Sequence, residues 1–391
     1  MDTIVDIGFP YHYLLEESKA TGRPSAVFLG NDYKNMSQSL DRKTYIALTD
    51  QCLDYLRKNC KDCDLYYKPH PNETDEYTTF NLTGFKVIPK EENEVAEVFF
   101  WKRLGSVKYV FSVASTSAWF AYNFGMNAYT FLKLAETVLG KDIGSAADYF
   151  KQLPESFFIR DFNQPLVENK KLIGTDPISE GKLIEDLRGS KDVWFIVGDP
   201  AMLVIYISFV KLIRKNLPDK KVRMILSRHH RWERVKEAYY ASEFDSVTSF
   251  PRNLYSLRPR KFLKIIRAVF AVKKFKLDPR DVLLCFANSN LIENCFLSFF
   301  PNKKIAVQFK EYFEINYGLR ESDILRGEKL RIRPTVRIFS LLIEPLLGLY
   351  PSIYKEYRDG RVNNIVRFVR PATEIYDRIY LLSDKHSTNI V

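Results

Sequence analysis

The sequence predicts an α/β protein with two doubly wound, Rossmann-like parallel sheets. Short buried β-runs alternate with helical stretches over residues 1–140, and a second alternation of the same kind begins at Val193. The length of 391 residues also exceeds what one hydrophobic core normally serves. We therefore expect a first Rossmann-like domain over 1–140, a connector with bridging helices over 141–190, and a second domain over 191–391.

The composition is typical of a packed, basic protein. Hydrophobic residues make up 46% of the chain and aromatic residues 14%, which argues for well-filled cores and against disorder. The net charge of +11 indicates an anionic partner or surface, such as nucleic acid, anionic lipid or an acidic sugar. No zinc-finger spacing, RNA-binding aromatic motif or basic helix-turn-helix pattern is present, so we expect no nucleic-acid partner.

The cysteines and the apolar runs indicate a cellular compartment. Five unevenly spaced cysteines do not make a disulfide framework and fit a reducing cytosol. The chain starts without a basic-then-apolar leader, and no apolar run reaches the length of a membrane span. We therefore expect a cytoplasmic protein. Neither of two short patterns predicts a metal site. Cys60 and Cys63 lack the second pair of ligands that a zinc site needs. Asp62 and Asp64 lie at the amino end of an expected strand, which is the wrong edge of the sheet for a catalytic metal.

The expected elements of the first domain alternate regularly. A buried strand ends in Gly30-Asn31, where the glycine would let a ligand approach the backbone. A helix then precedes a strand that ends at Lys68. The expected strands are 25–29, 64–68, 85–88, 107–112 and 128–132, and the expected helices are 41–59, a stretch that starts near 89, and 117–124.

The segment Lys68-Pro69-His70-Pro71 is the most informative stretch of the chain. Its two prolines fix φ and remove backbone donors, so His70 is held at the carboxyl end of a strand. In open α/β sheets, ligands bind at that end. A later β-run closes in hydroxyl-bearing residues that would begin a helix, which is a favourable anion site. These features predict a phosphate clamp. Its residues would be Lys68, His70, Pro71, Ser112, Ser115, Thr116 and Ser117.

The second domain repeats the alternation of strands and helices. A buried strand at 193–197 runs into Gly198-Asp199-Pro200 and an apolar helix to about residue 214. The next strand, 222–227, ends in Arg228-His229-His230, which is either a pocket for a sugar carboxylate or a basic surface loop. Later strands are expected at 246–250, 282–287, 304–309, 365–369 and 378–382.

The stretch 258–276 has a helical pattern with many basic residues and no acidic one. One interpretation is an amphipathic helix with one face in the core and solvated lysines on the other. The second is a peripheral contact with an anionic membrane surface, and the two are compatible.

Three segments together resemble the bacterial sialyltransferase and Kdo-transferase group, which uses CMP-linked 2-keto-3-deoxy acid sugars. The segments are Lys68-Pro69-His70-Pro71, Ile88-Pro89-Lys90-Glu91 to Glu94, and Ser112-x-x-Ser115-Thr116-Ser117. The resemblance implies the GT-B architecture, in which two Rossmann-like domains face a cleft. It also implies that His70 and the hydroxyl run hold the CMP phosphate, and that Glu91 or Glu94 lies near the ribose or the cytosine.

The chain departs from the pattern of that group in two respects. The group's acidic pair followed by glycine has its nearest match after the strand 304–309, without the glycine; Glu311 there is either a catalytic base or a solvated loop carboxylate. The phosphate-binding domain also comes first in the chain instead of second. This order resembles the retaining β-Kdo transferases of O-antigen and capsule assembly, where an Asp is the nucleophile. Asp199 is the candidate here, with a helix-capping role as the alternative.

The sequence therefore predicts a metal-independent glycosyltransferase. It would move Kdo or a sialic-type sugar from CMP to a bacterial surface polysaccharide, such as lipopolysaccharide or capsule, or to a lipid-linked glycan. One His, hydroxyls and a helix N-terminus can balance the charge on a CMP leaving group without a cofactor. Two alternatives stay open: a CDP-glycerol or CDP-ribitol phosphotransferase, and a non-catalytic nucleotide-sugar-binding partner. The candidate catalytic residues are Asp199, Glu311 and His70, and the candidate carboxylate-binding residues are Arg228, His229 and His230.

Overall fold

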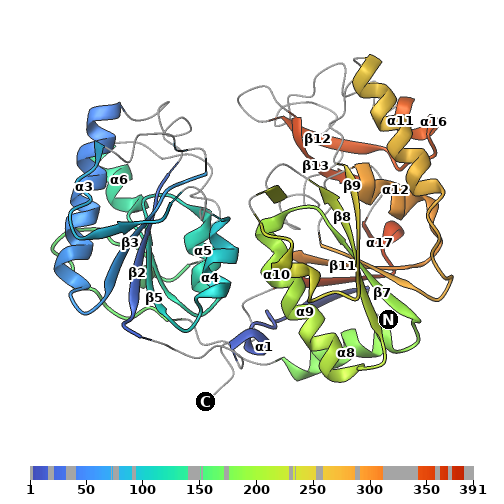
Figure 1. The fold of residues 1–391 in the computed structure, drawn as a ribbon, viewed down its shortest axis with the longest axis horizontal. Coiled ribbons are helices and arrows are strands. Elements are labelled where there is room, and N and C mark those ends of the chain that lie inside the picture. Colours follow the sequence, from blue (N-terminus) through green and yellow to red (C-terminus); the bar gives the residue numbers. More distant parts are fainter. Residues whose placement is uncertain are drawn as a thin grey trace. The chain divides into compact units, whose positions relative to one another are not determined.

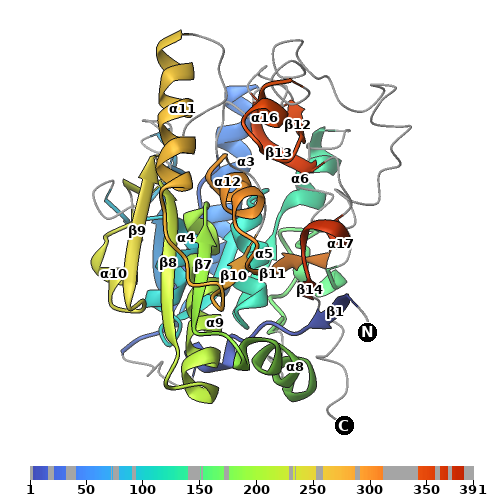
Figure 2. The same cartoon turned by 90° about the vertical axis from the view of Figure 1, so that its right-hand side faces the viewer.

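In the computed structural model the chain folds into two units, and each unit has an α/β fold (Figures 1 and 2). We call Tyr11–Ile173 unit 2, and Met1–Pro10 together with Gly174–Val391 unit 1. The residues that the structure describes are 3–15, 22–31, 41–71, 73, 79–89, 94–139, 150, 153–170, 176–228, 232–233, 235–251, 259–286, 291–310, 342–356, 362–368 and 372–382.

Unit 2 is built on a five-stranded parallel sheet with the order β4-β3-β2-β5-β6. The first strand lies in the middle, the next two follow on one side, and the last two follow on the other. The chain changes direction across the sheet between β2 and β5, which is the topological switch point of a doubly wound fold. The strands are β2 (Ser25–Leu29), β3 (Asp64–Lys68), β4 (Phe85–Val87), β5 (Val107–Ser112) and β6 (Asn127–Thr130).

Helices cover both faces of this sheet. Figure 1 shows α3 on one face and α4 with α5 on the other. The long helix α3 begins where the Asp41 carboxylate accepts a hydrogen bond from the Thr44 amide at 3.0 Å, an N-cap that satisfies one otherwise unpaired helix donor. The helices are α1 (His12–Leu15), α3 (Arg42–Asn59), α4 (Ala96–Lys102), α5 (Thr116–Asn123), α6 (Leu132–Leu139) and the short 3₁₀ helix η3 (Glu155–Phe157).

Residues 153–170 pack against the β6 edge of unit 2. Bridges join Thr130 to Phe158 and Asn127 to Lys170. The Tyr129 hydroxyl donates a hydrogen bond to the carbonyl of Val167 at 2.7 Å. This segment therefore belongs to unit 2, whereas the sequence had placed it in a connector over 141–190.

Unit 1 contains a seven-stranded parallel sheet with the order β1-β14-β11-β10-β7-β8-β9. Six of these strands come from the segment Gly174–Val391, and they are arranged as in unit 2: β7 lies in the middle, β8 and β9 follow on one side, and β10, β11 and β14 follow on the other. The switch point of this sheet therefore lies between β7 and β10. A separate antiparallel pair, β12 (Ser352–Glu356) and β13 (Val362–Phe368), contains the strand expected at 365–369. The sheet strands are β1 (Ile4–Ile7), β7 (Asp192–Val197), β8 (Lys221–Arg228), β9 (Ser246–Pro251), β10 (Val282–Cys285), β11 (Lys303–Phe309) and β14 (Arg378–Leu382).

The first strand of the chain pairs with the last strand of this sheet. Ile4 lies opposite Ile379 and Ile7 opposite Leu382 in a parallel register. The predicted first domain, 1–140, therefore differs from the structure at its start. A strand of four residues carries no local signal that tells which sheet it joins, because pairing is decided by long-range contacts.

The helix α8 is fixed to unit 1 by the carboxylate of Asp186. That carboxylate accepts hydrogen bonds from Lys303 Nζ at 2.8 Å, Arg378 Nε at 3.0 Å and the Tyr380 hydroxyl at 2.8 Å. Burial alone would raise the pKa of Asp186, but these three partners together lower it. The helices of unit 1 are α8 (Pro177–Arg188), η4 (Pro200–Met202), α9 (Leu203–Asn216), α10 (Ala238–Ala241), α11 (Pro259–Lys273), α12 (Leu291–Phe299), α16 (Glu344–Leu346) and α17 (Ala372–Ile375).

None of the helices in the described parts of the chain combines the length and the apolar character needed to span a membrane.

Candidate functional site

The strand register of unit 2 brings the predicted motifs to one edge of its sheet. Leu29, the last residue of β2, lies opposite Lys68 of β3 on one side and Ser112 of β5 on the other. Neighbouring strands run about 4.8 Å apart, so the turns that follow these three residues leave the sheet side by side. This edge is the carboxyl end of a doubly wound sheet at its switch point, where such folds bind ligands.

The turn after β3 is held in shape by Glu73, which is only 4% exposed. Its carboxylate accepts hydrogen bonds from the His70 amide at 2.8 Å and from the Tyr67 hydroxyl at 2.7 Å. The Glu73 amide in turn donates to the His70 carbonyl at 2.9 Å. The turn is therefore fixed through the backbone of His70, while the His70 side chain is partly exposed and Pro71 is half-buried.

Gly30 is required by the packing of this turn. A Cβ at Gly30 would overlap the Glu73 carboxylate and would lie 2.8 Å from the Tyr67 hydroxyl and 2.9 Å from the His70 amide nitrogen. We expected this glycine to admit a ligand, and the structure gives it a different close neighbour, the chain's own carboxylate. Sequence reasoning missed Glu73; the available signal was a carboxylate three residues after His70, within reach of its amide.

Lys68 makes a buried structural contact. Its side chain is 2% exposed, and Nζ donates a hydrogen bond of 2.5 Å to the carbonyl of Glu94 and lies 5.7 Å from the centre of the Phe99 ring. The ammonium group therefore holds the segment before α4 against β3, a contact that the sequence did not predict for it.

Glu94 presents an unused acceptor near the same edge. Its side chain is 8% exposed, and Oε1 accepts a hydrogen bond from Lys102 Nζ at 2.7 Å. The other oxygen, Oε2, is buried and has no hydrogen-bond partner in the described part of the chain. A buried acceptor without a partner carries a desolvation cost that a ligand donor would relieve. Glu91, the alternative candidate, lies outside the described residues.

The hydroxyl run shapes the start of α5. Ser112 is fully buried, and its Oγ accepts a hydrogen bond from the Ser115 amide at 3.2 Å. Ser115 Oγ caps the helix by accepting a hydrogen bond from the Ser117 amide at 3.3 Å. The Ser117 hydroxyl donates to Glu97 Oε1 at 2.8 Å. Thr116 at the first helical position is exposed. The hydroxyls therefore organise the turn, and Glu97, which is 5% exposed and was missed in the sequence, fixes α5 to α4.

Asn31 joins the turns that follow β2 and β5. Its side chain is 5% exposed, and Oδ1 accepts a hydrogen bond from the Ala114 amide at 3.3 Å. The amide nitrogen Nδ2 is buried and has no hydrogen-bond partner among the described residues. Leaving a buried donor unpaired costs about 1–3 kcal/mol. The unused donor thus lies at the switch point, on a side chain whose oxygen contacts Ala114, two residues before α5 begins at Thr116.

The electrostatics of this edge favour a ligand with both an anionic oxygen and donor groups. The N–H groups and the dipole at the start of α5 attract negative charge, and Asn31 Nδ2 adds a second donor. Glu94 Oε2 supplies the complementary acceptor. A nucleotide carries phosphate oxygens together with ribose hydroxyls or a base amine, so it matches this set.

In unit 1, Asp199 follows β7 at that unit's own switch point and is exposed. Arg228 is the last residue of β8, and its Nη2 lies 3.9 Å from Glu237 Oε2.

Glu293, in the first turn of α12 after β10, is buried at the same sheet edge, and the sequence analysis did not identify it. Burial, followed by the charges of Asp199 and Glu293, raises the pKa of Tyr206 well above its ordinary value. His229, His230 and Glu311 lie outside the described residues.

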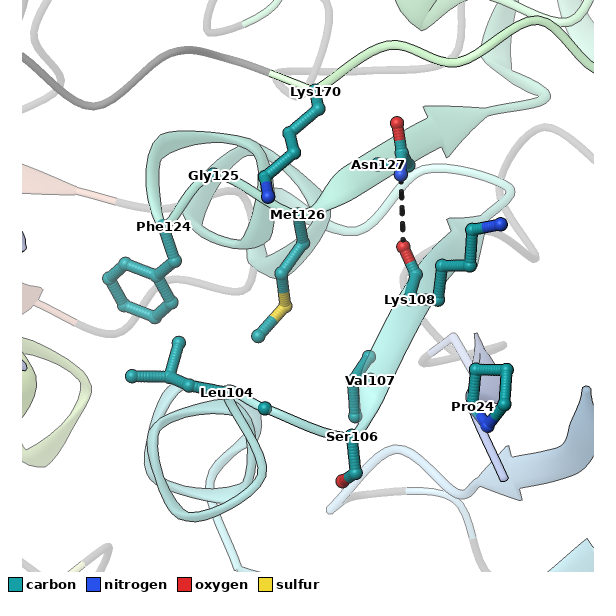
Figure 3. Close-up of a pocket in the computed structure, with 11 residues that line it drawn as sticks. Pro24, Leu104, Ser106, Val107, Lys108, Phe124, Gly125, Met126, Asn127 and Lys170 are labelled. Atoms are coloured by element: carbon teal, nitrogen blue, oxygen red, sulfur yellow. Dashed lines mark hydrogen bonds between the residues drawn. The ribbon is translucent and has the colours of Figure 1, made fainter. Parts of the chain in front are cut away.

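A cavity of about 300 Å³ lies at the opposite edge of the unit 2 sheet. Figure 3 shows Val107 at the start of β5 and Asn127 at the start of β6, with Asn127 Nδ2 donating to the Lys108 carbonyl at 3.3 Å. Because doubly wound sheets bind ligands at the carboxyl ends of their strands, we do not assign the candidate site to this cavity.

The described residues contain no group of three or more His, Cys, Asp or Glu side chains placed to hold a metal ion.

No family model matches the sequence, and comparisons with curated proteins and with solved structures found no match. The residues at the switch point of unit 2 therefore provide the indication of function.

Proposed function

We propose that the protein is a glycosyltransferase that moves an acidic 2-keto-3-deoxy sugar, of the Kdo or sialic type, from its CMP donor to a glycan acceptor without a metal. The observation that carries the proposal is the buried Asn31 Nδ2 donor, which lacks a partner among the described residues at the switch point of unit 2. Next to it are the start of α5 and the turn that presents His70.

A monoester phosphate suits these groups in number and charge. Departure of CMP leaves negative charge on one phosphate, and fixed donors aimed at that charge stabilise the transition state. The Asn31 amide and the N-terminus of α5 are such donors, and both are held by hydrogen bonds before a ligand arrives. His70 supplies the third donor, from a turn that Glu73 fixes through the backbone.

Glu94 provides a reason for cytosine over uracil. A carboxylate oxygen accepts hydrogen bonds and donates none, so it pairs with the exocyclic amine of cytosine or with a ribose hydroxyl. The same oxygen repels the carbonyl that uracil carries in place of that amine. Buried Oε2 of Glu94, which lacks a partner in the described part of the chain, is the group we assign to this discrimination.

Unit 1 would bind the acceptor, as the second Rossmann-like domain of a GT-B-type enzyme whose phosphate-binding unit comes first in the chain. Asp199 would attack the anomeric carbon in a double displacement that retains configuration, or Glu311 would remove the acceptor proton in a direct displacement. The basic side chains Arg228, His229 and His230 would bind the sugar carboxylate, because a carboxylate needs charged or donor-rich surroundings. The acceptor is a bacterial surface polysaccharide or its lipid-linked precursor.

The test is release of CMP from CMP-Kdo or CMP-sialic acid in the presence of glycan acceptors. His70→Ala should lower turnover by about 10²-fold or more, because a group that stabilises leaving-group charge is lost. The fold should stay intact, because Glu73 contacts the backbone of His70. Wild-type turnover in His70→Ala would overturn the phosphate assignment. A mass assay of intact protein after donor incubation identifies a sugar adduct, which Asp199→Asn should abolish if configuration is retained.

The same assay separates the alternatives. A product heavier by glycerol phosphate or ribitol phosphate, formed from a CDP-linked polyol, would replace sugar transfer with phosphotransfer. Tight CMP binding without turnover of any donor would indicate a non-catalytic nucleotide-sugar-binding protein.

A further inference from the structure

The helix α11 exposes two large apolar side chains to solvent. Leu263 is 55% exposed and Phe270 is 56% exposed. Figure 2 shows α11 extending past the end of β9 within unit 1. At about 100° per residue, Arg260, Leu263, Arg267 and Phe270 fall within an arc of about 80° on the helix surface. Lys274 falls within the same arc: it directly follows the last residue of α11, and its amide still donates to the Phe270 carbonyl at 3.1 Å. We call these five residues the outward stripe of α11.

The opposite face of the same helix packs into the hydrophobic core of unit 1. Ile265, Ala268, Val269 and Val272 are buried, and α11 packs against α12. The helix therefore does not need Leu263 or Phe270 for its own folding. An ordinary surface helix places polar residues opposite its buried face. Two exposed large apolar side chains on the outward stripe therefore indicate a surface that binds a partner.

The charge of the segment limits the kind of partner. Between Pro259 and Lys276 the chain carries seven Lys and Arg residues and no Asp or Glu. Arg260, Arg267 and Lys274 on the outward stripe are exposed. The partner is therefore anionic. Nucleic acid would use the cations but would leave an aliphatic Leu263 in water, whereas a lipid surface offers phosphates and an acyl boundary within a few ångströms of each other.

We propose that the outward stripe of α11 docks unit 1 on an anionic lipid bilayer. Leu263 and Phe270 enter the boundary between headgroups and acyl chains, and the Arg and Lys side chains contact lipid phosphates. A helix of 15 residues lying in the plane of the interface covers about 22 Å of membrane surface. This docking does not depend on the reaction that the protein performs.

Cosedimentation with vesicles tests the docking. The full-length protein should bind vesicles of 30% phosphatidylglycerol in phosphatidylcholine and should not bind pure phosphatidylcholine. Arg267→Gln with Lys274→Gln should weaken partitioning about 25-fold, since each cation near an anionic surface contributes about fivefold. Leu263→Ala with Phe270→Ala should weaken it at least tenfold at unchanged charge.

The matched control lies on α8 of the same unit. Ile178 is 75% exposed and Lys182 is exposed one helical turn later, the same spacing as Phe270 and Lys274. Ile178→Ala with Lys182→Gln should leave partitioning unchanged. Circular dichroism melts check that every variant is folded.

Three outcomes would overturn the proposal. In the first, the wild-type protein stays in the supernatant with anionic vesicles. In the second, the α8 control variant loses as much vesicle binding as the α11 variants. In the third, Leu263→Ala with Phe270→Ala leaves vesicle binding unchanged. The last result would show that charge alone attracts the protein, and a competing gel-shift with double-stranded DNA at the same ionic strength would then identify the anionic partner.

Discussion

The side-chain oxygen of Asn31 accepts a hydrogen bond from the Ala114 amide at 3.3 Å and so joins the turns that follow β2 and β5. These strands are neighbours in the sheet but lie about eighty residues apart in the chain. The contact orients the Asn31 amide, whose nitrogen is buried and lacks a partner among the described residues. The proposed phosphate site depends on this orientation.

Asn31→Asp should weaken CMP binding at least tenfold, as measured by calorimetry. The substitution keeps the size of the side chain and its oxygen toward Ala114, but replaces the unused donor with a negative charge beside the phosphate. Asn163→Asp adds the same charge at an exposed position of unit 2 and should leave CMP affinity unchanged. Equal affinities for wild type and Asn31→Asp would contradict the assignment of this donor.

Gly30→Ala should destabilise unit 2 by about 2 kcal/mol, because the new methyl group overlaps the Glu73 carboxylate. Urea unfolding measures this cost. In a Glu73→Ala background the same substitution should cost clearly less, with a coupling of about 1 kcal/mol in the double-mutant cycle.

Gly181→Ala is the control for that cycle. A Cβ at Gly181 meets nothing within 4 Å, and the position lies inside α8, so alanine should stabilise by about 0.5–1 kcal/mol. Additive costs of Gly30→Ala and Glu73→Ala would show that the carboxylate does not occupy the space beside Gly30.

Asp186→Asn should destabilise unit 1 by roughly 2 kcal/mol at pH 7, because Lys303, Arg378 and Tyr380 lose a charged acceptor. The pKa of Asp186 is lower in the folded protein than in the unfolded chain. Its stabilisation is therefore complete above the unfolded pKa, near 4, and is lost as the pH falls through the lowered folded pKa.

Urea unfolding of wild type and Asp186→Asn at several pH values checks this dependence. The difference in free energy of unfolding should be constant above about pH 5 and should shrink below about pH 4. Glu185→Gln, at an exposed position next to Asp186 on α8, should show little difference at any of these pH values. A difference that grows on acidification would contradict the sign of the pKa shift.

The five cysteines should resist thiol reagents in the native protein at pH 8 and react fully in denaturant. All five are buried and free, and burial raises the pKa of each thiol, that of Cys60 to about 12. Stopped-flow absorbance with an aromatic disulfide measures the rate. Rapid reaction of any thiol before unfolding would contradict its burial.

Much of the fold could be predicted from periodicity. The helix expected at 41–59 is α3, and the strand expected at 64–68 is β3, because a strong local pattern with clear turn residues defines each. The doubly wound character of both sheets followed from the alternation of strands and helices. The pairing of β1 with β14 could not be predicted, because the contact spans the whole chain.

The candidate site was predictable in position and less so in detail. Strand ends marked by Gly30-Asn31, Pro69-His70 and Ser112 had to meet once the sheet was parallel. The sequence could not show that Lys68 points to a carbonyl, because a buried lysine and an exposed lysine share the same local pattern. It also could not show that Glu73 fills the space beside Gly30.

Hydrogen–deuterium exchange of the full-length protein with and without CMP measures whether the nucleotide binds at the switch point of unit 2. We predict that CMP slows exchange in the turns after β2, β3 and β5, which contain Asn31, His70 and Ser115, and that Asn31→Asp reduces this protection at a CMP concentration near the wild-type dissociation constant. No protection at saturating CMP, or protection confined to unit 1, would contradict the assignment of the nucleotide phosphate to the switch point of unit 2.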